Sequence, residues 1–367
     1  MFVYKAKVHH RTAQARTRLR MPPRCPLEPL MPASDVSVVI PAYNAAHFLA
    51  DALHGIAQQT LQPREVIIVN DGSTDDTVQT VAAWIAAHPQ PYPIHLHNQS
   101  NSGIAATRNQ GIRLAQGEWL AFLDADDIFE PEHIAELMRA LAAEPKAKGA
   151  YGAGRLLAKG VLQDMLYDDY WDSPSRKFGT PIAGTDFYRI DKQILPRMIK
   201  GNFIKPSSLV VSRALANEVG LFNEKLATAE DREFLVRLLL KACFVYAPVA
   251  ITQYRWHDDN ASHVRNARRN AENGLLAIKI IRDNPNIGLG PVEIGACQDA
   301  IASTLQEYFY MCSQHGVAAY AQGMRFAQRH FGWASAHASL RVKNLVRSVM
   351  ALFVDPLKNP AKDYPDL

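Results

Sequence analysis

Acidic side chains follow an apolar stretch of the sequence near residue 122. Asp124, Asp126 and Asp127 come directly after the run Ala121-Phe122-Leu123, so a buried element would fix the backbone where these carboxylates emerge. Mg²⁺ and Mn²⁺ are commonly held by one or two carboxylates, with phosphate oxygens of a substrate completing the shell. Such an ion would neutralise the charge that develops on a departing diphosphate. For an isolated Asp-x-Asp the ordinary interpretation is a helix-capping turn. A metal site is therefore predicted only if other polar segments are expected at the same place in the fold.

Two other polar segments have a comparable character. Asp71-Gly72-Ser73 stands at an expected strand-to-helix turn, where Asp71 could accept a hydrogen bond from a nucleobase imide; a turn without function is the alternative. Gly103 begins an expected helix that places Arg108 in an early turn. Helix N-termini attract anions and arginine adds a bidentate donor, so Arg108 is a candidate phosphate ligand. A helix start with a solvated arginine is the equally supported alternative.

The residues that could carry chemistry lie between predicted strands and helices, which alternate along the sequence. Short β-branched runs alternate with longer amphipathic stretches, which is typical of βα units that build a doubly wound, mostly parallel sheet. The expected strands are 36–40, 65–69, 94–97 and 118–123, and the expected helices lie near 46–59, 75–87 and 103–115. Ligands bind outside the carboxyl ends of such strands. We therefore expect the polar loops after the first, second and fourth strands to converge at one edge.

Beyond residue 130 the pattern becomes mixed, and beyond residue 261 it becomes helical. In the mixed part we expect helices near 131–143, 186–199 and 230–241 and strands near 149–158 and 207–212. The later helices are expected at 262–283, 291–313, 318–329 and 338–354. The fold class is therefore α/β, flanked by helices and followed by a helical C-terminal extension.

Four segments, taken together and in order, resemble the family 2 glycosyltransferases of GT-A fold. They are Val36-Ser-Val-Val-Ile-Pro-Ala-Tyr-Asn44, Val69-Asn-Asp-Gly-Ser-Thr-Asp-Asp-Thr77, Asn101-Ser-Gly-Ile-Ala-Ala-Thr-Arg-Asn109 and Leu123-Asp-Ala-Asp-Asp127. The resemblance implies a nucleotide-sugar donor, inversion at the anomeric carbon, and a Mn²⁺ or Mg²⁺ ion.

The resemblance also implies roles for individual residues. Asp126 would be the principal metal ligand, Asp124 would lie near the ribose, and Asp71 would read the base. The residues implied to bind the nucleotide-sugar are Pro41, Tyr43, Asn44, Asp71, Arg108 and Asp124.

A second part of the resemblance covers residues 202–234, which match the acceptor half of such enzymes. It contains Glu230-Asp231. Inversion by single displacement needs a base that takes the proton of the acceptor, and a carboxylate can do this. We predict Asp231 as that base, with Glu230 as the second candidate. Thr228 and Asp231 also have the spacing of a helix capping box, and the two interpretations are compatible.

The segment Tyr254-Arg255-Trp256-His257 ends an extended stretch. Alternation along a strand places Arg255 and His257 on the same face, so His257 is a candidate metal ligand and Arg255 a candidate phosphate ligand. An exposed strand end is the alternative. Processive polymerases of the family carry Gln-x-x-Arg-Trp here, and this chain is one residue shorter after Gln253, which favours the addition of a single sugar.

The charge of the chain is uneven. Residues 1–30 carry seven lysines and arginines against one acidic residue, whereas the whole chain has a formal charge of only +4. The remainder is mildly acidic, which argues against a nucleic-acid binder with its basic stripes. We expect residues 1–33 to be a disordered basic leader, with translation starting near Met21 or Met31 as an alternative. Four cysteines without a CxxC pair fit reduced thiols in the cytoplasm.

A basic amphipathic helix is expected around residues 340–354. Its apolar residues are Val342, Val346, Val349 and Phe353, beside Arg341, Lys343 and Arg347. Such a helix could rest on an anionic membrane surface, on the inner face of the cell membrane. Packing of the apolar stripe into the core is the favoured alternative.

These observations predict an inverting, metal-dependent glycosyltransferase. It would move one sugar from a nucleotide-diphosphate-sugar, with UDP as the expected carrier, to a hydroxyl of a glycan or lipid-linked acceptor in cell-surface polysaccharide synthesis. Residues 34–130 would form the nucleotide-sugar half, 131–260 the acceptor half and 261–367 a helical region. One alternative is a sugar-phosphate nucleotidylyltransferase, although its glycine-rich phosphate loop is missing. The other is a non-catalytic nucleotide-sugar-binding protein, which would not need Glu230-Asp231.

Overall fold

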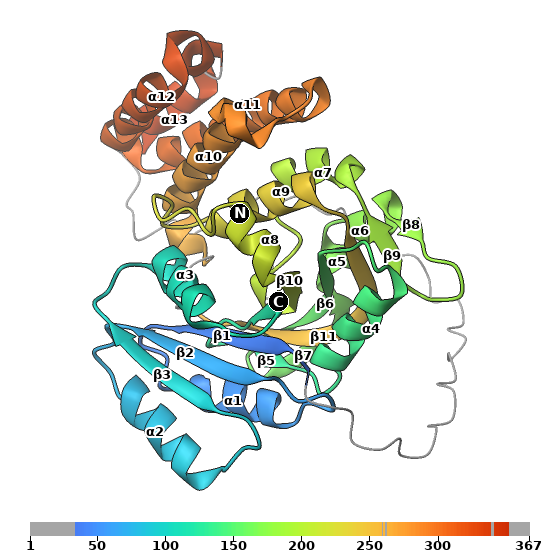
Figure 1. Cartoon of the computed structure of the whole chain (residues 1–367). Helices are drawn as coiled ribbons and strands as arrows, with labels where there is room; N and C mark the ends of the chain where they lie inside the picture. Colours follow the sequence, from blue (N-terminus) through green and yellow to red (C-terminus); the bar gives the residue numbers. More distant parts are fainter. Residues whose placement is uncertain (1–33, 259, 261–262, 339–340, 352–367) are drawn as a thin grey trace, which may run out of the picture.

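The computed structural model describes residues 34–258, 260, 263–338 and 341–351. The predicted leader at 1–33 lies outside the described residues, as do Phe353 and the other residues at the end of the predicted helix 338–354. A mixed sheet with helices on both faces carries a group of helices at one end (Figure 1).

The first half of the sheet is parallel, as predicted. Its strands are β1 (Val36–Ala42), β2 (Glu65–Asp71), β3 (Ile94–Gln99) and β4 (Trp119–Phe122), in the order β3-β2-β1-β4. Along β1, Val38 and Ile40 enter the core on one face of the sheet and Val39 enters it on the other. Every residue of β1 is buried, which is typical of a central parallel strand covered on both faces.

The second half of the sheet brings a distant strand to the same edge. Antiparallel β10 (Leu209–Ser212) lies between β4 and β6 (Gly149–Ala158), and β11 (Phe244–Trp256) pairs with β6 in parallel. Two reversals restore the direction, so β11 runs the same way as β1 and β4. Short strands complete the sheet: β5 (Ile128–Phe129), β7 (Val161–Leu166), β8 (Thr180–Pro181) and β9 (Tyr188–Ile190).

The helix predicted at 186–199 is wrong in its first half. Tyr188–Ile190 instead form β9, which pairs antiparallel with Phe244–Tyr246 of β11. The α-helix, α7, covers only Leu195–Lys200, with Pro196 in its first turn. Proline there starts a helix readily, and the pairing with β11 determines the conformation upstream.

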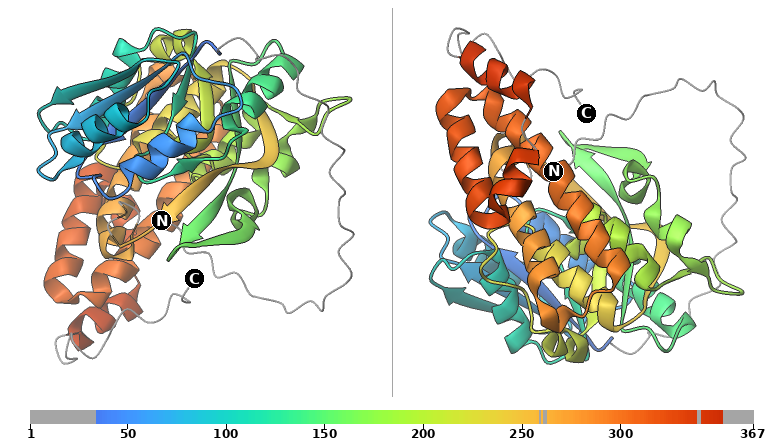
Figure 2. Two further views of the ribbon diagram at one scale, coloured as in Figure 1. Left: turned by 90° about the horizontal axis from the view of Figure 1, so that it is seen from below. Right: turned by 90° about the horizontal axis from the view of Figure 1, so that it is seen from above.

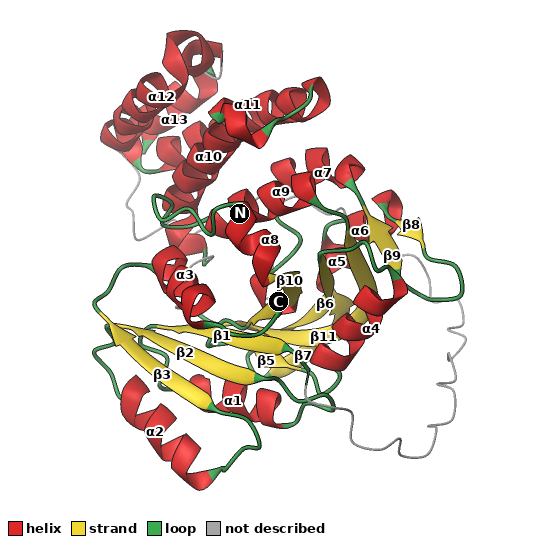
Figure 3. Cartoon of the chain, in the orientation of Figure 1, coloured by secondary structure: helices red, strands yellow, loops and turns green. Residues whose placement is uncertain are grey.

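Helices cover both faces of the sheet (Figure 3). One core lies beneath α1 (Leu49–Ala57), α2 (Thr77–Ala87) and α4 (His133–Ala143). The opposite core lies beneath α3 (Ile104–Leu114), α7, α8 (Arg213–Glu218) and α9 (Glu230–Lys241). Two short helices, α5 (Tyr167–Tyr170) and α6 (Pro174–Phe178), follow β7.

Four further helices form the C-terminal region, which Figure 2 shows in orange and red on one side of the molecule. They are α10 (Ala267–Asp283), α11 (Pro291–Gln314), α12 (Gly316–Ala338) and α13 (Val342–Met350). Residues 264–266 form a 3₁₀ turn, so the predicted helix 262–283 begins later than expected. Leu275 of α10 and Leu305 of α11 belong to the same buried cluster as Phe234 of α9. Among the described helices, none has the length and apolar character needed to cross a membrane.

Candidate functional site

The loops after β1 and β2 are joined by hydrogen bonds at the carboxyl edge of the sheet. Asn44 Oδ1 accepts a bond from the backbone N–H of Thr74 at 2.8 Å, and the N–H of Asn44 donates to Ser73 Oγ at 2.9 Å. Tyr43 is exposed beside them, whereas Pro41 is buried within β1. The predicted convergence of these two loops is therefore present.

Asp71 organises the turn that leads into α3. Its buried carboxylate accepts hydrogen bonds from Gln99 Nε2 at 2.8 Å, from the N–H of Ser102 at 2.8 Å and from the N–H of Gly103 at 2.9 Å. Gly103 has a φ of 87°, a conformation that glycine adopts without strain. The carboxylate keeps accepting capacity for one more donor, because it has about four lone-pair sites.

Arg108 joins the two halves of the protein. Its guanidinium is only 2% exposed, and it donates from Nη2 to Asp124 Oδ1 and from Nη1 to Glu230 Oε1, both at 2.6 Å. The alternative of a solvated arginine is therefore wrong. Burial, together with the charge of Asp231, raises the pKa of Glu230 to about 7, although Arg108 opposes this shift.

Close packing of α3 on the sheet fixes the position of Arg108. A Cβ atom on Gly111 would lie 2.2 Å from Cγ1 of Val39 in β1, so only glycine lets the helix approach this closely. One turn earlier in α3, Arg108 then points at the carboxyl end of β4, where Asp124 follows.

Asp126 meets side chains from the end of β11. One oxygen, Oδ2, lies 3.0 Å from His257 Nε2 and 3.0 Å from Asn260 Nδ2. Arg255 Nε donates to the carbonyl of Asp126 at 3.0 Å, and the Arg255 backbone N–H donates to Asp127 Oδ1 at 3.0 Å. Arg255 and His257 thus converge on the acidic segment because β11 ends at the same edge as β4.

Arg255 also contacts residues at the start of α1. Nη2 of Arg255 donates to Asp51 Oδ2 at 2.6 Å, and the Arg255 guanidinium lies over the ring of Phe48, 5.2 Å from the centroid. Asp127 behind it is buried, and burial together with the charges of Asp126 and Asp124 raises its pKa well above the ordinary range.

The Asp126–His257 pair fits two neighbouring ligand positions of a metal site. A separation of 3.0 Å matches the ~3 Å between neighbouring corners of an octahedron with bonds of ~2.1 Å. Within the described part of the chain, no three His, Cys, Asp or Glu side chains gather as a complete protein-only site would need. A cation here would take its remaining ligands from phosphate oxygens and water, as Mg²⁺ commonly does.

Asp231 differs from its neighbour Glu230 in its surroundings. Glu230 is buried and paired with Arg108, whereas Asp231 is partly exposed and accepts a hydrogen bond from Asn202 Nδ2 at 2.7 Å. The capping-box alternative is wrong, because α9 follows Ala229 in a left-handed conformation, without a side-chain cap. Thr228 Oγ1 is buried and makes no hydrogen bond with the described residues.

The sequence interpretation missed four polar residues of this region. Asn202 and Asn260 contact the predicted Asp231 and Asp126, and Ser207 Oγ accepts from the Asp124 N–H at 3.0 Å. The fourth is Lys205, whose pKa is raised by Tyr167 and by the carboxylates of Asp231 and Asp127. Asn202, Lys205 and Ser207 lie in the segment that resembles the acceptor half, and this resemblance could have identified them as candidates. No motif or spacing in the sequence indicates Asn260.

Comparison with known proteins identifies relatives of the chain. Residues 37–158 match the family model of glycosyl transferase family 2. An uncharacterized glycosyltransferase of Haemophilus influenzae is 28% identical over 265 residues, which cover 71% of this chain and 76% of that protein. One from Rickettsia felis is 26% identical over 231 residues, 62% of this chain, and the match spans only 35% of that longer relative.

Solved structures show the same fold at low sequence identity. The S. aureus protein TarS (residues 1–349), in complex with UDP-GlcNAc, has a TM-score of 0.56 at 19% identity and covers 86% of this chain and 88% of that one. The mannosyltransferase PcManGT from Pyrobaculum calidifontis, in complex with GDP-Man and Mn²⁺, has a TM-score of 0.55 at 20% identity, covering 85% and 87%.

Proposed function

The chain belongs to the family 2 glycosyltransferases of GT-A fold, and on this premise we propose that it transfers one sugar, with inversion, from a nucleotide-diphosphate-sugar to a hydroxyl group. The proposed acceptor is a glycan or lipid-linked sugar of a cell-surface polysaccharide. The reaction is proposed to need Mn²⁺ or Mg²⁺.

The buried ion-pair bridge of Arg108 is the observation that carries this proposal. It ties Asp124, at the edge where donors bind in open sheets, to Glu230, which adjoins the candidate base Asp231. A protein that only binds a nucleotide-sugar has no need to couple that edge to a second pair of carboxylates. The bridge therefore favours a transferase.

The donor half of the proposed site is the edge formed by the loops after β1, β2 and β4. Asn44 and Asp71 would contact the nucleoside, with exposed Tyr43 available for stacking, and Arg255 would contact phosphate. Asp126 and His257 would hold the cation, which supplies neutralisation of the diphosphate as it leaves.

The acceptor half contains the proposed base. The acceptor oxygen forms a bond to the anomeric carbon while the bond from that carbon to the diphosphate oxygen breaks, and the hydroxyl proton passes to a carboxylate oxygen of Asp231. Asn202 orients Asp231 through its 2.7 Å hydrogen bond. Glu230 is paired with Arg108 instead, so we assign it a positioning role.

We propose UDP as the carrier. Of the two structural neighbours described above, TarS is in complex with UDP-GlcNAc and PcManGT with GDP-Man, so the test must offer both carriers.

Nucleotide release tests the proposed function. Incubated with Mn²⁺ and UDP-, GDP- or dTDP-sugars, the protein should slowly release nucleoside diphosphate even without an acceptor. Exchange of pyrophosphate into the nucleotide-sugar would instead identify a nucleotidylyltransferase, and binding without release would identify a binding protein. Asp231→Asn should keep donor binding while losing transfer by about 10²-fold or more; full transfer by this variant would overturn the assignment of the base.

A further inference from the structure

Helix α13 turns its apolar side away from the protein. Its buried residues are polar: Asn344 and Ser348 face α11 and α12, and Ser348 is fully buried. Apart from Lys343, its exposed residues are apolar, including Val342 at 80% and Leu345 at 54% exposure. The exposed apolar residues, with the i, i+3, i+4, i+7 spacing of a single helix face, are Val342, Leu345, Val346, Val349 and Met350.

Polar contacts hold α13 in this orientation. Arg347 lies over the ring of Tyr310 in α11, 4.4 Å from the centroid, and donates to Ser313 Oγ at 3.3 Å. Arg341 donates to Gln306 Oε1 at 2.8 Å. The sequence-based preference for core packing of the apolar stripe is therefore wrong, because the polar side of the helix is the side that is bound.

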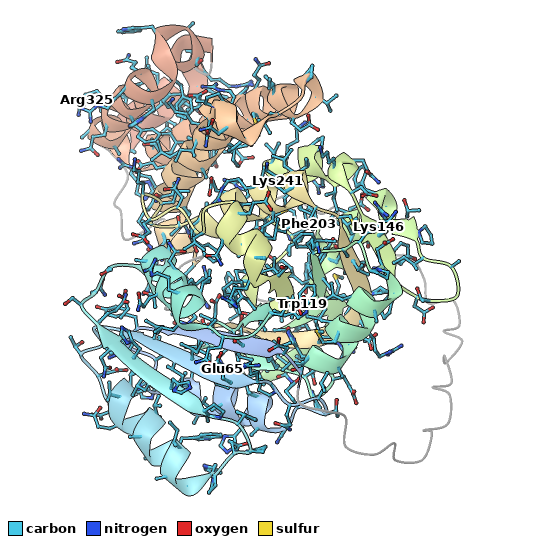
Figure 4. The ribbon with its side chains drawn as sticks, in the orientation of Figure 1. Glu65, Trp119, Lys146, Phe203, Lys241 and Arg325 are labelled. Atoms are coloured by element: carbon cyan, nitrogen blue, oxygen red, sulfur yellow. The ribbon has the colours of Figure 1, made fainter. Side chains whose placement is uncertain are left out.

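The stretch of sequence that contains this face is basic. No aspartate or glutamate occurs between Glu307 and Asp355. Over the same stretch the sequence has five lysines and arginines: Arg325, Arg329, Arg341, Lys343 and Arg347. Arg325 and Arg329 are exposed on α12, and Figure 4 shows Arg325 at the outer margin of that helix.

An exposed tryptophan lies on α12, in the same helical region as the apolar face and the basic residues. Trp333 of α12 is 62% exposed, and tryptophan is enriched at membrane–water interfaces, where one side of its ring is apolar and the other is hydrated. Figure 1 shows α12 and α13 at the opposite end of the molecule from α2.

We propose that the outer face of α13, with the basic surface of α12, binds the surface of an anionic lipid bilayer. The apolar residues enter the headgroup and acyl boundary, while Lys343 of α13 and the exposed Arg325 and Arg329 of α12 attract anionic headgroups. A second copy of the chain fits less well, because two regions with five basic and no acidic residues repel each other. The inference does not depend on the identity of the sugar or the acceptor.

Vesicle flotation of the full chain tests this proposal. Wild-type protein should float with vesicles of phosphatidylglycerol and phosphatidylcholine, should stay behind with phosphatidylcholine alone, and should be released by high salt. Val346→Asp/Val349→Asp should lower the partition coefficient about tenfold or more. The matched control is Val161→Asp/Val292→Asp, whose wild-type side chains are 60% and 68% exposed, and it should float like wild type.

Lys343→Glu separates the electrostatic contribution to vesicle binding from the apolar one. Because it changes an exposed side chain, it also provides a second test if Val346→Asp/Val349→Asp does not fold. It leaves the apolar face intact, so it should still bind anionic vesicles, but more weakly and with less dependence on salt. The proposal is overturned if wild-type protein shows no preference for anionic vesicles, or if Val346→Asp/Val349→Asp floats as wild type does. A third result would also overturn it: light scattering shows that the wild type is a dimer and that Val346→Asp/Val349→Asp is a monomer, while vesicles bind neither the wild type nor this variant.

Discussion

At the scale of single residues, Asn202 and Asp231 show what spacing alone does not reveal. Asp231 was predicted because Glu230-Asp231 lies in a segment with a family resemblance. Asn202 has no such chemical signature, yet its amide holds one carboxylate oxygen of Asp231. The contact joins residues 29 positions apart and depends on how α7 meets α9, which no local pattern encodes.

The substitution Asn202→Ala should slow transfer without weakening donor binding. The lost hydrogen bond leaves Asp231 free to turn, so we expect kcat to fall about 10- to 100-fold while the donor KM stays unchanged. Steady-state kinetics with saturating acceptor measures both constants. Asn217→Ala, which changes an exposed asparagine of α8, is the matched control and should behave as wild type. An unchanged kcat for Asn202→Ala would argue that Asp231 needs no positioning.

At the scale of elements, the sequence predicted the βα alternation from Val36 to Leu123 because each strand and helix there shows its own periodicity. The sequence did not predict β9, and it did not predict the length of β11 or its pairing with β6. Both depend on pairing with strands many residues away. His257 and Arg255 were singled out from alternation alone, and only the direction of β11 explains why they arrive at Asp126.

The close approach of α3 to β1 predicts a large effect of a small substitution. Gly111→Ala forces a methyl group against Val39, so we expect the free energy of unfolding to fall by about 1–3 kcal/mol in urea titrations. Gly295→Ala is the matched control, because its Cβ would meet nothing within 4 Å; it should gain about 0.5–1 kcal/mol. Equal effects at the two sites would contradict the packing described for α3.

The histidine that links α4 to β11 predicts a pH dependence of stability. His133 is fully buried, stacks on Phe129 and makes a 3.0 Å hydrogen bond to the carbonyl of Ile251, and burial lowers its pKa to about 3. Between pH ~6.5 and ~3 the unfolded chain therefore binds a proton that the folded protein does not. Stability should fall with decreasing pH by up to about 1.4 kcal/mol per unit in this window.

Urea unfolding as a function of pH isolates this contribution. The His133→Gln variant should have a flatter profile below pH ~6.5 than wild type, whereas His315→Gln, which changes an exposed histidine, should keep the wild-type slope. Parallel profiles for wild type and His133→Gln would show that this histidine is protonated in the folded protein.

At the scale of the whole molecule, the helical region divides into a part that stabilises the fold and a part that does not. Leu275 of α10 and Leu305 of α11 share the core of α9, whereas α13 is bound through polar contacts. Truncation after residue 338 should therefore shift the melting temperature by only a few degrees, and truncation after residue 260 should expose the core of α9 and prevent folding. Thermal unfolding with circular dichroism distinguishes the two; a stably folded 1–260 fragment would contradict the shared core.

The central claim concerns the carboxyl edge of the sheet, where Asp126 contacts His257, and nucleotide binding tests it most directly. Calorimetric titration of UDP and GDP, with Mn²⁺ and with EDTA, compares the wild type with Asp126→Asn. The account predicts that Mn²⁺ tightens binding of one diphosphate to the wild type at least about tenfold, a gain of about 1.4 kcal/mol, and that Asp126→Asn loses this gain. Equal affinity with EDTA, or an undiminished effect of Mn²⁺ in Asp126→Asn, would contradict it.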